Sequence, residues 1–311
     1  MEKILLFVLI GLGAQLVDGT LGMAFGVTAT TLFILSGTGA ATASAVVHVV
    51  EVGTTFVSGI SHWRFGNVDW GRVLRLGVPG AVGAFVGATF LSNLDGDAAT
   101  PVTSSILLGL GLWVLVRFAF LGGGRVTAAK KWGVRKLAPL GLVGGLLDST
   151  GGGGWGPVTT STLMSAGEGQ PRKIIGTVSA AEFLVTVAAT LGFLPLLREE
   201  FAEHTLPILG LLVGGVLAAP IAAFLVGRIN PRTLGIVIGG VLVLLNLRTL
   251  FGTVTPLLLG WVAVVAAILV WSRSHDTLPW LRHRVRLDPV EEKDDADEDA
   301  AAKTGAARAG R

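Results

Sequence analysis

Apolar stretches of about 20 residues recur along most of this chain and constrain its fold more than any other feature. Each is long enough to cross the ~30 Å hydrocarbon layer of a membrane as a helix. They occupy residues 40–62, 73–94, 100–121, 174–197, 205–227, 232–251 and 254–272. Lipid offers no hydrogen-bond partners to open backbone, so a spanning segment of this length must be helical unless it joins a closed barrel. We therefore predict an all-α polytopic membrane protein.

The charged residues are too few and too unevenly placed for a water-soluble globule. Of the 45 Asp, Glu, Lys and Arg residues, 16 lie in the last 38 positions, so about 11% of the preceding 273 residues are charged. An average soluble domain has ~25%. The basic residues are dispersed in short loops, so we expect no nucleic-acid partner. The absence of cysteine excludes disulfides, thiolate metal sites and thiol catalysis.

Two other apolar stretches are too long for one span and too short for two. Residues 4–35 contain one charge, Asp18, and residues 137–166 contain one charge, Asp148. As straight helices they would be roughly 45–48 Å long. Glycines interrupt both, in Asp18-Gly-Thr-Leu-Gly-Met-Ala-Phe-Gly26 and Asp148-Ser-Thr-Gly-Gly-Gly-Gly-Trp-Gly156. Each is either a broken helix that crosses the membrane or a re-entrant hairpin that returns to its starting side.

The two interrupted stretches match each other, and so do the helices that follow them. At offsets of 130 and then 131, the matched pairs are Asp18 with Asp148, Thr20 with Thr150, Gly22 with Gly152, Gly26 with Gly156, Thr30 with Thr160, His48 with Ser179, Glu51 with Glu182, and Thr55 with Thr186. This is an internal duplication. We predict a first repeat over 1–121, a basic cytoplasmic loop over 122–136, a second repeat over 137–251, an additional transmembrane helix over 252–273 and a disordered cytoplasmic tail over 274–311.

The distribution of basic residues favours hairpins over crossing helices. With two hairpins, 16 basic residues fall on one side of the membrane and three on the other, whereas crossing helices give 11 and eight. The first division follows the positive-inside rule. It places the N-terminus outside and the C-terminus in the cytoplasm.

Each half then holds one hairpin and three spans. Because each repeat has an odd number of spans, the second repeat starts on the other side of the membrane, and the halves are inverted. The glycine-rich tips then meet near the midplane, as in many secondary transporters. Oligomeric state is not readable from the sequence.

The hairpin tips are candidate anion sites. The second helix of each hairpin would begin at mid-membrane, where its first N–H groups have no helical partner and carry partial positive charge. Glycines and threonine hydroxyls at both tips complete the predicted substrate-binding set, which is Gly22, Gly26, Thr28, Thr30, Gly152, Gly153, Gly156, Thr159 and Thr160. Alternatively, the glycines only permit close packing of the tips.

Ionisable residues inside the apolar segments form a second candidate set. Charge there is costly, and such residues often mark ion pathways. We predict that five of them couple transport to protons, namely Asp18, His48, Glu51, Asp148 and Glu182. The structural alternatives are that the aspartates cap broken helix ends, that the glutamates pin a helix to a hairpin, and that His48 is an interior histidine paired to Glu51.

The motifs at these positions resemble the TauE/SafE sulfite exporter family. They are Gln15-Leu-Val-Asp-Gly-Thr-Leu-Gly-Met-Ala-Phe-Gly26, Ser61-His-Trp-Arg-Phe-Gly-Asn-Val-Asp-Trp70 and the second-half Gly-Gly-Gly-Gly-Trp-Gly-Pro157. The resemblance covers about residues 4–272 and implies a bacterial or archaeal inner-membrane transporter of sulfite or organosulfonates. The first half departs from the pattern, with Val27 at the position of Pro157.

The main functional hypothesis is a secondary transporter that moves a small oxyanion outward, coupled to protons. The alternative is a cation or metal transporter with Asp18, Glu51, Asp148 and Glu182 as oxygen ligands. An enzyme is disfavoured because the sequence has no nucleophile–base pair and no metal-binding motif such as His-Glu-x-x-His. We expect no cofactor and no resident metal.

Overall fold

The computed structural model describes residues 2–120, 132–196, 204–225 and 231–252, with residues 261, 264–268 and 270 beyond them. The helices are α1 (Glu2–Leu21), α2 (Phe25–Leu35), α3 (Ala40–Arg64), α4 (Trp70–Ser92), α5 (Gly96–Ala119), α6 (Val134–Gly151), the π-helical turn η1 (Gly156–Thr160), α7 (Ser161–Ser165), α8 (Pro171–Gly192), α10 (Thr205–Leu225) and α11 (Pro231–Phe251). No strand occurs among these residues, and six of the helices are long and apolar enough to cross a membrane. The prediction of an all-α polytopic membrane protein is confirmed.

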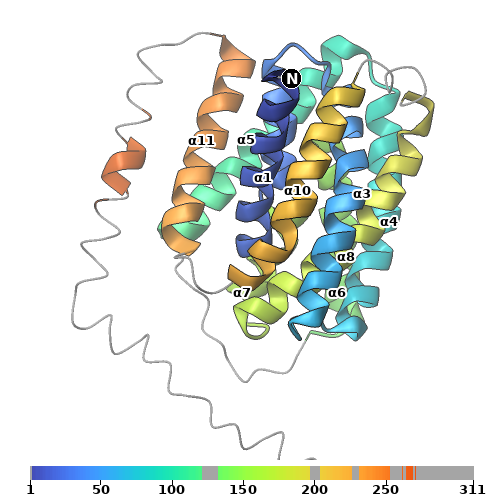
Figure 1. Ribbon diagram of the computed structural model, residues 1–311, viewed down its shortest axis with the longest axis vertical. Coiled ribbons are helices and arrows are strands. Elements are labelled where there is room, and N and C mark those ends of the chain that lie inside the picture. The colour runs from blue at the N-terminus through green and yellow to red at the C-terminus, as the bar shows by residue number, and fades with distance from the viewer. Residues whose placement is uncertain are drawn as a thin grey trace, which may run out of the picture. The chain divides into compact units, whose positions relative to one another are not determined.

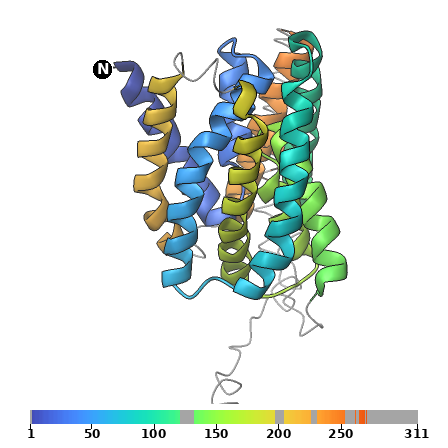
Figure 2. The ribbon, with the colours of Figure 1, turned by 90° about the vertical axis from the view of Figure 1, so that its right-hand side faces the viewer.

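The helices pack side by side as a bundle (Figures 1 and 2). The most extensive pairings are α4 with α6 and α8, α1 with α10, α5 with α11, and α3 with α8. Most of the predicted cytoplasmic loop and most of the predicted final span lie outside the described residues, and so does the whole predicted tail.

The first interrupted stretch doubles back on itself. The ring of Phe7, near the start of α1, stacks on the ring of Phe33, near the end of α2, at a centroid distance of 6.1 Å. The turn between the legs needs left-handed backbone at Gly22 (φ 69°) and at Ala24 (φ 114°), a conformation that glycine adopts without steric cost. The legs are unequal, because α1 has 20 residues and α2 has 11.

The second interrupted stretch doubles back in the same way. The backbone N–H of Trp132, just before α6, donates to the carboxylate of Glu168, just after α7, at 2.8 Å. The first leg is the 18-residue α6, and the return leg consists of η1 followed directly by α7. We name the two stretches the first hairpin (residues 2–35) and the second hairpin (residues 134–165).

The bases of the hairpins lie at opposite ends of α3. A short connection leads from the first hairpin into α3, which at 25 residues is about 37 Å long. Just beyond its far end, Arg72 donates to the backbone carbonyl of Glu168 at 2.8 Å and to its carboxylate at 3.1 Å. Figure 1 likewise shows the N-terminus and α7 at opposite ends of the bundle. Hairpins that enter from opposite ends are what the predicted inversion requires, and the inverted relation of the complete halves stays a prediction.

Candidate functional site

The tips of the two hairpins bind each other through reciprocal contacts. The Thr30 hydroxyl donates to the carbonyl of Gly152 at 2.6 Å, and the Thr160 hydroxyl donates to the carbonyl of Gly22 at 2.8 Å. Thr30 and Thr160 are matched positions of the repeat, and so are Gly22 and Gly152. Such an exchange is what two like units related by a two-fold axis produce.

Close approach at this contact explains two of the glycines. A Cβ at Gly26 would lie 2.7 Å from the Cα of Gly153 and 2.7 Å from Oε1 of Glu51, and one at Gly156 would lie 2.6 Å from the Cα of Met23. Real Cβ atoms do not come so near, so both positions exclude a side chain. The packing alternative therefore accounts for these glycines, and the same packing brings the two helix starts together.

The predicted threonines lie at the tips, but three of the four already donate their hydroxyl protons to carbonyls. Thr30 and Thr160 donate across the tips, and Thr159 donates to the Trp155 carbonyl at 2.5 Å. Thr28 is half-buried in the first turn of α2. Because a hydroxyl has one proton, the three engaged threonines offer only acceptor lone pairs to a ligand. In this arrangement an anion would therefore depend on backbone N–H groups rather than on these hydroxyls.

At the second tip, those backbone groups already hold a carboxylate. Oδ1 of Asp148 accepts from the backbone N–H of Gly154 at 2.7 Å and from that of Trp155 at 2.9 Å. The matched carboxyl, Asp18, lies beside the backbone N–H of Phe25 but makes no hydrogen bond of normal geometry there. Phe25 and Trp155 are matched positions, so each aspartate lies at the start of a return leg, and Asp148 caps it.

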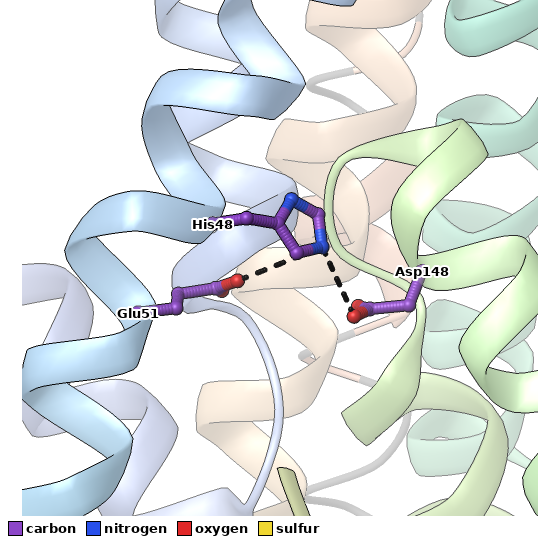
Figure 3. Close-up of side chains that lie close together, drawn as sticks. All are labelled: His48, Glu51 and Asp148. Atoms are coloured by element: carbon purple, nitrogen blue, oxygen red, sulfur yellow. Dashed lines mark hydrogen bonds and ion pairs between the residues drawn. The ribbon is translucent and has the colours of Figure 1, made fainter. Parts of the chain in front are cut away.

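His48 connects Asp148 to Glu51, as Figure 3 shows. Its Nδ1 lies 2.8 Å from the carbonyl oxygen of Ser44, and its Nε2 lies 3.2 Å from Oδ2 of Asp148 and 4.0 Å from Oε2 of Glu51. A carbonyl can only accept, so Nδ1 carries a proton. The Nε2–Asp148 contact therefore needs a second proton between its two atoms. The closest carboxyl to His48 is Asp148 from the other half, not Glu51 as the sequence suggested.

All four predicted carboxyls gather around this contact. Asp18, Glu51, Asp148 and Glu182 are each at least 92% buried and lie within range of one another's charge. Glu51 Oε2 makes no hydrogen bond to any residue that the structure describes. Within the described residues, His48, Glu51 and Asp148 also offer ligand atoms within 4.8 Å of one another, so they could hold a cation. We call these three residues the central cluster.

Sequence reasoning missed a set of hydroxyl contacts between α3 and α8. The matched residues Thr55 and Thr186 face each other at 3.4 Å, and Ser58 lies 2.7 Å from Ser179. His62, one turn further along α3, is completely buried. The signal was available in the spacing, because positions 48, 51, 55, 58 and 62 share one helical face.

The family model for the sulfite exporter TauE/SafE matches residues 7–249 of the chain. The protein belongs to the TauE/SafE family. A probable membrane transporter protein, YtnM of Bacillus subtilis (strain 168), is 48% identical over 239 residues, which cover 75% of this chain and 78% of YtnM. A second protein from that strain, the probable membrane transporter protein YdhB, is 26% identical over 171 residues, or 55% of this chain and 68% of YdhB. No solved structure matches significantly.

Membership of this family and the apolar helices identify a multi-pass membrane transporter rather than an enzyme. The resemblance expected from the glycine-rich motifs is confirmed.

Proposed function

We propose that the protein is a secondary transporter, and specifically an exporter, of a small oxyanion such as sulfite or an organosulfonate, coupled to protons. One observation carries this proposal. Backbone N–H groups at the start of the second hairpin's return leg bind a carboxylate oxygen of Asp148 at 2.7 and 2.9 Å. A carboxylate and a sulfonate present the same kind of charged oxygen to such donors. The tips therefore have the donor chemistry that an oxyanion needs.

The same contact suggests how binding is coupled to protons. A substrate oxygen can use the N–H groups of Gly154 and Trp155 only after Asp148 has left them. Protonation of Asp148 removes the charge that holds it there, and His48 stands 3.2 Å from its other oxygen to supply or receive the proton. Asp18 lies beside the matched backbone N–H of Phe25 in the first hairpin. Anion and proton then bind together, and negative charge at the crowded carboxyls is reduced as the substrate arrives.

Binding of a sulfonate to the purified protein tests this coupling. A sulfonate keeps a single negative charge over the neutral pH range, so pH acts only on the protein. We expect methanesulfonate or sulfite to be transported by proteoliposomes, and the apparent affinity for methanesulfonate to rise as pH falls. Asp148→Asn, which mimics the neutral carboxyl, should bind with an affinity that depends less on pH. Absence of transport for both anions would refute the proposed substrate class.

The central cluster favours one competing function, transport of a divalent cation. Its imidazole nitrogen and two carboxylates are a ligand set that transition metals accept. Competition separates the two. Excess Mn²⁺ or Zn²⁺ should leave uptake of labelled sulfite unchanged if the anion is the substrate. Metal uptake that is lost in Glu51→Gln and unaffected by sulfite would establish the cation instead.

A further inference from the structure

One face of α3 carries an unbroken row of buried polar side chains. His48, Glu51, Thr55, Ser58 and His62 follow one another at intervals of three and four residues, and none is more than 4% exposed. Residues at this spacing lie about 5–6 Å apart on the same side of a helix. The row, which we call the α3 row, runs from the central cluster to the end of α3 at which Arg64 lies.

Neighbouring helices supply hydroxyls beside the middle of the α3 row. The Thr55 hydroxyl donates to the Glu51 carbonyl at 2.5 Å and lies 3.4 Å from the Thr186 hydroxyl, so it can relay a proton only when it turns away from that carbonyl. The Ser58 hydroxyl lies 2.7 Å from that of Ser179, and either can donate. A hydroxyl that both donates and accepts can pass a proton on without a change in its own charge.

Both ends of the α3 row hold buried polar atoms that lack hydrogen bonds to described residues. At one end this is Oε2 of Glu51, and at the other it is both ring nitrogens of His62. The His62 ring lies beside the backbone of Gly19 but makes no hydrogen bond of normal geometry there. The side-chain nitrogen of Gln15, one turn before Gly19 on α1, also lacks a bond. Buried polar groups are rarely left so, and bound water is the usual partner.

The distances suit bridging water. A water that forms two hydrogen bonds of ~2.8 Å spans up to about 5.6 Å, which matches the separation of successive positions in the α3 row. Alternating side chains and waters would therefore connect Glu51 to His62. Arg64 is the charged residue of α3 nearest His62 in sequence.

The matched face of α8 lacks this connection. Glu182 and Thr186 correspond to Glu51 and Thr55, but Ala189 and Phe193 stand where α3 has Ser58 and His62. Both are fully buried, and the Phe193 ring packs against the ring of His48 at a centroid distance of 5.8 Å. The α3 row therefore runs from the central cluster towards one end of the bundle. The aromatic ring of Phe193 covers His48 instead of extending a polar row from it.

We propose that His62 is the outermost relay residue of a one-sided proton path, which links the central cluster through Ser58 and Thr55 to the bundle end at which α3 ends. This rests on the proposed proton-coupled function and assigns its path. At each step a group passes a proton to one neighbour and takes one from the other, so one proton moves and no residue is consumed. The basic loops predict that this end is cytoplasmic.

Access to a new thiol tests the path without any assumption about the substrate. The chain has no cysteine, so Ser58→Cys carries a single thiol. Silver ions react with a thiolate where water can bring them. In vesicles of known orientation, we expect silver ions added at the Arg64 end of the bundle to react with the Ser58→Cys thiol. Silver ions added from the other side should not react with it. Ala189→Cys, the matched control, should resist silver from either side. Equal labelling of both variants, or labelling of Ser58→Cys only from the opposite side, would overturn the proposal.

A second experiment measures the proton itself. In proteoliposomes, His62→Phe and Ser58→Ala copy the residues of the matched positions. We expect proton-driven sulfite transport to fall at least about tenfold in both, while exchange of labelled for unlabelled sulfite, which needs no net proton movement, changes less than about twofold. Equal loss of both activities, or loss of neither, would contradict the path. Failure of the wild-type protein to transport sulfite at all would refute the substrate, and the silver experiment would still decide the path.

Discussion

The helices α3 and α8 hold matched positions of the predicted duplication, and they differ where function would require a difference. Both keep a glutamate and a threonine at the centre, and the threonines meet at 3.4 Å. On α3 this centre is flanked by His48, Ser58 and His62, whereas α8 has Ser179, Ala189 and Phe193. The shared residues build the contact between the halves. The residues that differ place His48 and the α3 row in one half only.

The sharpest test of this difference compares the two central glutamates. Glu51 lies 4.0 Å from His48, and its Oε2 makes no hydrogen bond to the described residues. Glu182, the matched glutamate, has Ser179 at the position of His48. We expect Glu51→Gln to lower proton-driven sulfite transport about 100-fold or more, which is the scale for loss of a positioned proton carrier. Glu182→Gln should cost about tenfold or less. Transport assays in proteoliposomes measure both, and equal losses would remove the functional distinction between the halves.

The matched aspartates Asp18 and Asp148 should differ in their effect on stability. Asp148 accepts from two backbone N–H groups, whereas Asp18 lies beside that of Phe25 without a hydrogen bond of normal geometry. Each buried donor left unsatisfied costs about 1–3 kcal/mol. We therefore expect Asp148→Ala to lower the free energy of unfolding in detergent by roughly 2–6 kcal/mol and Asp18→Ala to lower it by less. A larger loss for Asp18→Ala would show that the first hairpin, not the second, depends more on its cap.

Contact between the tips should be sensitive to one added methyl group in either half. Gly26→Ala and Gly156→Ala would each force the other hairpin's backbone apart, at about 1–3 kcal/mol. Gly13, which is exposed on α1, is the matched control, because a methyl group added there would meet no atom within 4 Å. Gly13→Ala should be neutral or stabilising by up to about 1 kcal/mol. Thermal unfolding in detergent reports all three, and tolerance of Gly26→Ala would mean that the tips do not pack as closely in solution.

Periodicity and charge were sufficient to predict the class of fold. Apolar segments of membrane-spanning length required helices, and the glycine-interrupted stretches do double back. The sequence could not predict that the two legs of the first hairpin are unequal in length. The position of the turn at Gly22 and Ala24 depends on backbone conformation rather than on hydrophobicity. The first leg therefore has the length of a full span, while the return leg is half as long.

Residue types identified the candidate site, but the partners of each residue depend on how the halves meet. His48 was expected to pair with Glu51, its neighbour on the helix, and lies closer to Asp148, which is 100 positions away. The threonines were expected to donate to a substrate, and three of them donate to carbonyls instead. A spacing rule relates residues within one helix, whereas these contacts are set by packing between helices.

The smallest expected effects concern the hydroxyl pairs that join α3 to α8. Hydrogen bonds between membrane helices contribute about 0.6 kcal/mol on average and at most about 1.7 kcal/mol. Ser58 and Ser179, at 2.7 Å, should couple near the upper value, and Thr55 and Thr186, at 3.4 Å, near or below the average. Double-mutant cycles with alanine for the serines and valine for the threonines measure each coupling by unfolding. A stronger coupling for the threonines would place the firmest contact at the centre of the duplication, and Ser58 would then be freer to exchange its partner for water.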